Sequence, residues 1–69
     1  MKALTKESAQ TVARMLAMEL RRSKGTMAGS SAKYSAMASV LVAAGIEVKQ
    51  IRKDNKPIAV IVDGEKVEV

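Results

Sequence analysis

The spacing of apolar residues predicts a helix in the first third of the chain. Five apolar residues recur at three- and four-residue intervals and form one stripe: Ala9, Val12, Ala13, Leu16 and Leu20. Thr5 is the candidate N-cap at the start of this stripe. Arg21 and Arg22 lie where cations complement the helix dipole, and Gly25 follows them. We therefore predict a helix over residues 5–23.

A second helix is predicted over residues 31–44, with Gly45 as a left-handed terminator. Its expected core stripe consists of Tyr34, Met37, Ala38 and Leu41. Its opposite face is expected to carry small residues, namely Ser35, Ala36, Ser39 and Ala43. No charged residue occurs from Tyr34 through Ile46, whereas a surface helix normally has a charged face.

A chain of this length can hardly surround a helix on all sides, so the uncharged second helix predicts self-association. We expect a homodimer in which these small residues let another backbone approach, and a weakly polar exposed face is the alternative. Met15 and Met18 lie to one side of the first helix's stripe and are further candidate interface residues. Filling of gaps in the core is the alternative role for these two methionines.

The last third of the chain predicts three strands. Apolar and polar residues alternate from Ile46, which predicts a strand over 46–52 and a polar turn over 53–56. Pro57 then opens a second strand over 58–62, because a missing N–H is tolerated at that position. Asp63 and Gly64 predict a two-residue type I′ turn into a third strand over 65–69.

The same turn predicts which side chains share a face of the hairpin. The expected core face consists of Ile58, Val60, Val62, Glu65, Val67 and Val69, with Val60 facing Val67 across the strands. The expected opposite face consists of Ala59, Ile61, Lys66 and Glu68.

Composition agrees with an α+β fold. All leucines and methionines precede residue 42, and most Val and Ile residues follow residue 45, where β-branched side chains suit strands. We predict a single domain over residues 1–69, with two helices, a Gly/Ser-rich basic loop over 23–31, and a three-stranded antiparallel β meander. The uncharged run over 34–46 is too short to cross a bilayer, so we expect a cytoplasmic protein without membrane association.

The net charge of +5 is unevenly distributed, because the whole excess lies within residues 1–33. One group of candidate phosphate-binding residues consists of Arg14, Arg21, Arg22, Lys24 and Lys33. A second group lies around the first strand and its turn: Lys49, Arg52, Lys53 and Lys56. A solvated charged surface, or protection of a strand edge, is the alternative for both groups.

The residue types narrow the function classes. The chain has no histidine and no cysteine, so it lacks the common nucleophile–base pairs and the ligands of a Cys/His zinc site. We expect neither an enzyme nor a cofactor. Lys and Arg bind phosphates, and the near-absence of aromatic residues disfavours a base-stacking platform.

The sequence thus predicts a small nucleic-acid-binding protein, a dimeric regulator that contacts duplex DNA in preference to RNA through the first helix and the following loop. The alternative is a protein-interaction module, such as an inhibitor, an adaptor or an antitoxin-like protein. This module would dock through the uncharged second helix or a strand edge.

Two short segments resemble known families. Residues 43–48 and 52–57, a helix end followed by a basic hairpin, resemble the recognition helix and wing of winged-helix proteins. Residues 51–62 are similar to the hairpin of Phd-type antitoxins. The second similarity covers less than a third of the chain, and the antitoxins' early strand and toxin-binding tail have no counterpart here. Neither similarity assigns a family.

Overall fold

The computed structural model describes residues 4–22 and 32–69 and confirms the α+β order over these stretches. The helices are α1 (Lys6–Arg22) and α2 (Ala32–Ala43), and the strands are β1 (Val48–Lys53), β2 (Lys56–Val62) and β3 (Glu65–Glu68). The strands form an antiparallel meander of order β1-β2-β3, as predicted. The predicted basic loop over 23–31, including Lys24, lies outside the described residues.

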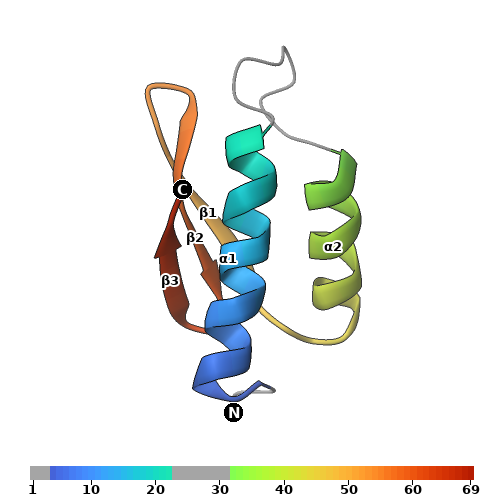
Figure 1. Ribbon diagram of the computed structural model, residues 1–69. Coiled ribbons are helices and arrows are strands. Elements are labelled where there is room, and N and C mark those ends of the chain that lie inside the picture. Colours follow the sequence, from blue (N-terminus) through green and yellow to red (C-terminus); the bar gives the residue numbers. More distant parts are fainter. Residues whose placement is uncertain (1–3, 23–31) are drawn as a thin grey trace.

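Both helices lie on the same face of the sheet (Figure 1). Helix α1 packs across β2 and β3, while α2 runs antiparallel beside α1 and reaches β1. The opposite face of the sheet carries no helix among the described residues.

The core lies between α1 and the sheet. Its largest fully buried side chains are those of Leu16, Leu20, Val60 and Val62. The predicted stripe of α1 is confirmed, although Val12 is only half-buried and Ala17 is buried as well. Val12 and Ala17 lie on opposite edges of the stripe, so the buried arc of α1 is turned away from α2 and toward the sheet.

The helix-end signals at Thr5 and Gly45 are confirmed, whereas Gly25, expected beyond the end of α1, lies outside the described residues. The Ser8 N–H donates to Thr5 Oγ1 at 3.1 Å, which is the N-cap bond of α1. At the end of α2, the Ile46 N–H donates to the Leu41 carbonyl at 2.9 Å, and the Gly45 N–H donates to the Val42 carbonyl at 3.0 Å. With Gly45 at φ +84°, these bonds form a Schellman motif.

Replacing Gly45 by alanine is expected to lower the free energy of unfolding by about 1 kcal/mol, because an L-residue is strained in the left-handed region. Apart from the two adjoining residues, no atom of the described part of the chain lies within 4 Å of a Cβ at this position, so the cost comes from the backbone and not from a clash. Gly45→Asn is the matched control, since asparagine tolerates this conformation. Its free energy of unfolding is expected to fall by less than that of Gly45→Ala. Urea denaturation followed by circular dichroism measures both losses, and equal stability of wild type and Gly45→Ala would contradict the prediction.

The hairpin between β2 and β3 has the predicted register, with Val60 opposite Val67 and Val62 opposite Glu65. Asp63 and Gly64 have φ values of 51° and 90°, as a type I′ turn requires. Asp54 and Asn55 also have positive φ, at 53° and 64°. Because the turn between β1 and β2 is this short, the strands extend to Lys53 and from Lys56, beyond the predicted bounds.

The burial of β2 differs from the expected pattern at two positions. Ile51 pairs with Ala59 but Arg52 pairs with Pro57, so an irregularity in the register leaves Ile58 without a partner on β1. Ile58 is 43% exposed although it was expected on the core face, whereas Ala59 is only 1% exposed although it was expected on the opposite face. The bulge breaks the simple alternation, and the short Ala59 side chain lies in the central strand between neighbours on both sides.

Candidate nucleic-acid interface

The fold brings basic residues from distant parts of the sequence to one end of the domain. Helix α1 ends, α2 begins and the turn between β1 and β2 lies at this same end (Figure 1). The described cations there are Arg21, Arg22, Lys33, Arg52, Lys53 and Lys56, all of them exposed. We call this set the basic end.

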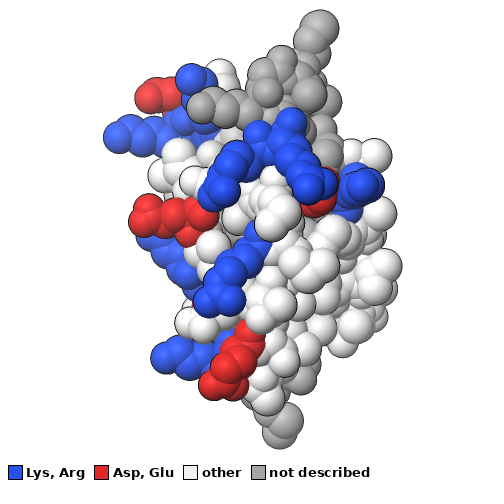
Figure 2. Space-filling model, in the orientation of Figure 1, with Lys and Arg blue, Asp and Glu red and all other residues white. Residues whose placement is uncertain are grey.

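The opposite end of the domain carries most of the acidic residues. It contains the first turn of α1, the segment before β1 and the turn between β2 and β3, with Glu7, Glu47, Asp63 and Glu65. In Figure 2, blue side chains follow α1 and gather in the upper part of the molecule, while the surface over α2 is largely white. The cations are therefore concentrated toward one end, although Asp54 lies in the turn at that end and Lys6 lies in the first turn of α1 at the other.

The turn between β1 and β2 projects as a two-stranded ribbon. Strand β3 pairs with β2 only from Ala59 to Val62, so residues 52–57 extend beyond β3. Lys53 and Lys56 face each other across this ribbon, directly beside the turn. Like charges in opposite positions are destabilising, and an anion bound near both ammonium groups would relieve their repulsion.

Arg52 supports the ribbon from within. Its guanidinium donates to Gln50 Oε1 at 2.6 Å and to the Asn55 carbonyl at 2.8 Å. The side chain thereby connects the strand to the turn and helps to hold the left-handed Asn55 in place. Of the cations predicted on the ribbon, Lys53 and Lys56 thus remain the exposed candidates for a phosphate contact.

The remaining predicted cations are not all at this end. Arg14 is exposed halfway along α1, and Lys49 lies near the start of β1, 3.6 Å from the Glu47 carboxylate and away from the ribbon tip.

At the basic end itself, Arg22 lies 3.7 Å from the Glu19 carboxylate. Because exposed ion pairs of this kind contribute little, Arg22 can exchange this partner for a phosphate.

The predicted interface residues are all exposed: Met15, Met18, Ser35, Ala36, Ser39 and Ala43. The structure adds Val40 and Val42, which are 69% and 58% exposed. The interface predicted from the sequence did not include either valine. Their signal was the absence of charged residues from Tyr34 through Ile46, which leaves no long charged side chain beside them.

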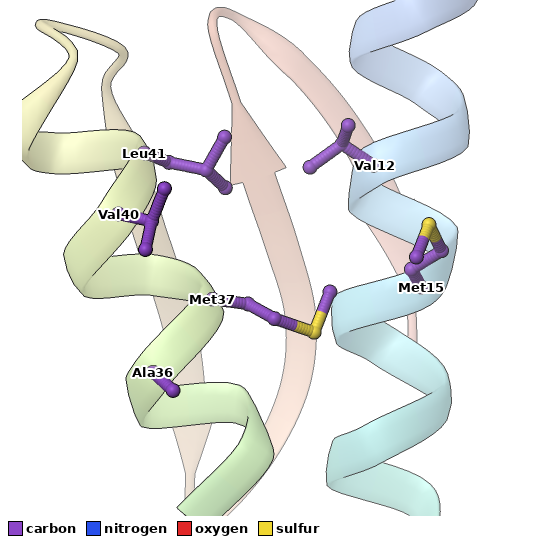
Figure 3. A pocket seen from close by; sticks show the side chains of 6 residues that line it. All are labelled: Val12, Met15, Ala36, Met37, Val40 and Leu41. Carbon is purple, nitrogen blue, oxygen red and sulfur yellow. The ribbon is translucent and has the colours of Figure 1, made fainter.

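An apolar groove separates the two helices and has a volume of about 350 Å³. Its lining consists of Val12, Met15, Ala36, Met37, Val40 and Leu41. Met37 and Leu41 point from α2 toward α1, and Val12 points back toward α2 (Figure 3). The groove offers no polar group to orient a small ligand, so it belongs with the apolar surface of the helices and not with the basic end.

Comparison of the chain with protein-family models, with curated proteins and with solved structures finds no match. Within residues 4–22 and 32–69, no group of acidic side chains could hold a metal ion. Neither described helix is long and apolar enough to span a bilayer.

Proposed function

We propose that this domain binds duplex nucleic acid, DNA in preference to RNA, through phosphate contacts made by the basic end. The observation that carries this proposal is the convergence of Arg21, Arg22, Lys33, Lys53 and Lys56 from four elements onto one end of the fold. Cations gathered in this way release the counterions of a phosphate backbone, which is the main source of non-specific affinity for DNA.

The shape of the basic end suits a duplex. A two-stranded ribbon is narrow enough to enter the major groove of DNA, and residues 52–57 form such a ribbon. With the ribbon tip in the groove, Lys53 and Lys56 would meet the phosphates at its edge. Arg21 and Arg22 at the end of α1 would then contact the backbone beside it.

Single-stranded binding by base stacking has little support. Tyr34 is the one aromatic residue in the sequence, and its side chain is buried in the core beneath α2. A stacking platform needs exposed aromatic faces. We therefore expect weaker binding to a single strand than to a duplex of the same sequence.

The decisive experiment compares two charge reversals of equal size. Lys53→Glu/Lys56→Glu removes cations from the ribbon, whereas Lys6→Glu/Lys66→Glu changes the net charge equally at exposed positions away from it. Fluorescence anisotropy with a labelled DNA duplex is expected to show at least a tenfold loss of affinity for the ribbon variant. Its plot of log K against log salt should become shallower by about 2, because each lost phosphate contact removes about 0.9 to 1.

The control variant is expected to retain most of the affinity and the salt slope of the wild type. Equal losses of DNA affinity in the two variants would mean that the overall charge of the protein attracts DNA and that the ribbon is not a specific site. The proposal fails if the wild type does not bind at low salt, or if its affinity is indifferent to salt. Circular dichroism verifies that both variants remain folded.

The second candidate function is a protein-interaction module, and the exposure of Val40 and Val42 is the observation that favours it. Large apolar side chains on an uncharged helix are typical of a docking surface. Reversal of Arg21 and Arg22 to glutamate separates the two candidates, because it should abolish binding through the basic end and leave docking through α2 intact.

A further inference from the structure

The outer face of α2 combines small and exposed apolar side chains. Ala32, Ala36, Ser39 and Ala43 follow one another at intervals of four, three and four residues, so they form one stripe along the helix. All four are exposed, and Val40 and Val42 border the stripe on its two sides. This face lies opposite the core stripe of α2, and its edge at Ala36 and Val40 also lines the groove beside α1.

We infer that α2 pairs with α2 of a second copy of this chain, antiparallel, about a two-fold axis near Ala36 and Ser39. The small stripe lets the two helix backbones approach closely. The bordering valines then pack against the partner helix and leave water, which is the favourable term in the association.

The distribution of charge favours a second copy of the chain as the occupant of this face. The chain carries +5, so two copies repel each other wherever their charged surfaces meet. The surface over α2 is largely uncharged (Figure 2), and α2 itself has Lys33 as its one charged residue. A two-fold interface brings the same patch together from both subunits, and an uncharged apolar patch can meet itself without repulsion.

The area of this face of α2 determines how tightly we expect two copies to associate. A stable interface of standard size buries about 800 Å² on each partner, roughly a sixth of the 4740 Å² surface of the described domain. Helix α2 has 12 residues and is about 18 Å long, so it supplies less than this even with Met15 and Met37 at the border of the groove. We therefore expect a reversible monomer–dimer equilibrium with a Kd on the order of micromolar.

Charge also selects the antiparallel orientation. Lys33 lies in the first turn of α2, and Glu47 follows the end of this helix. In an antiparallel pair, Lys33 lies near Glu47 of the partner subunit and near the negative end of the partner's helix dipole. A parallel pair would instead bring two basic ends together, which repel each other.

Sedimentation equilibrium of the full chain across the micromolar range tests the association. The wild type is expected to change from monomer to dimer, and Ser39→Glu is expected to weaken dimerisation at least tenfold because it places two carboxylates near the axis. Thr11→Glu is the matched control on the exposed side of α1 and should leave the equilibrium unchanged. A wild type that stays monomeric throughout, or equal effects of the two substitutions, overturns the proposal.

Charge exchange tests the orientation. Lys33→Glu and Glu47→Lys are each expected to weaken the dimer a few-fold, and the double variant Lys33→Glu/Glu47→Lys is expected to recover the wild-type equilibrium. Stronger dimerisation of Lys33→Glu alone would indicate a parallel pair and overturn the antiparallel arrangement. The Lys53→Glu/Lys56→Glu variant should still dimerise, so the failure of DNA binding and the failure of dimerisation are separately visible.

Discussion

Replacing Leu16 by alanine is expected to lower the free energy of unfolding by about 3 kcal/mol. Leu16 is fully buried at the centre of α1, and truncating a buried leucine costs its transfer free energy plus the cavity that remains. A domain of this length has a total stability of roughly 3–10 kcal/mol on the usual per-residue scale. The substitution therefore removes a third or more of the stability, because a core without phenylalanine or tryptophan has few large side chains to compensate.

Met15→Ala is the matched control for this prediction. Met15 precedes Leu16 on the same helix but is half-exposed, so its truncation should cost less than 1 kcal/mol. Guanidinium denaturation monitored by the helical signal at low protein concentration gives both values without a contribution from association. Equal losses at the two positions would mean that α1 does not bury the predicted face.

Replacing Val60 by aspartate is expected to unfold the domain near neutral pH. Val60 is fully buried in the central strand, and an unpaired carboxylate in such a site costs several kcal/mol. Burial raises the pKa of the introduced carboxyl in the folded state above its value of about 3.9 in the unfolded chain. The penalty is therefore full above the folded-state pKa, and it decreases as the pH falls from that value toward the unfolded one.

The measurement is the difference in stability between wild type and Val60→Asp as a function of pH. This difference should shrink on acidification in this window, since the neutral carboxyl is easier to bury. Ile58→Asp is the control on the same strand, where the side chain is 43% exposed, and it should show a small loss with little pH dependence. A penalty at Val60 that does not change with pH would contradict the electrostatic explanation.

Local signals explain what the sequence could predict. The Thr5 cap, the Gly45 terminator and the Asp63-Gly64 turn each depend on a few neighbouring residues, and all three are confirmed. The irregularity at Ile58 depends on how β2 aligns with β1, because the register next to the turn at Asp54 and Asn55, with Lys53 opposite Lys56, shifts by one residue between Arg52 and Ile51. The sequence marked this segment only as a polar turn, so the strict alternation along β2 was assumed.

In the candidate site, too, the sequence shows which residues are present but not how the fold brings them together. The basic residues themselves were visible in the sequence, but they formed two separate groups along the chain. Only the antiparallel arrangement of α1, α2 and the first hairpin shows that Arg21, Lys33 and Lys53 lie at one end while Lys49 lies toward the other. The engagement of Arg52 with Gln50 and Asn55 likewise depends on the turn geometry and has no signal in the residue pattern.

The position of α1 across β2 and β3 has a consequence for how the domain folds. The helix near one end of the sequence buries its apolar stripe against the strands near the other end, so most of the chain must close into a loop before this core exists. Without α1 the meander would expose its apolar face to water, and a helix in a protein gains most of its stability from the packing of its apolar face. We therefore expect that neither half folds alone and that the domain gains and loses its structure as one cooperative unit.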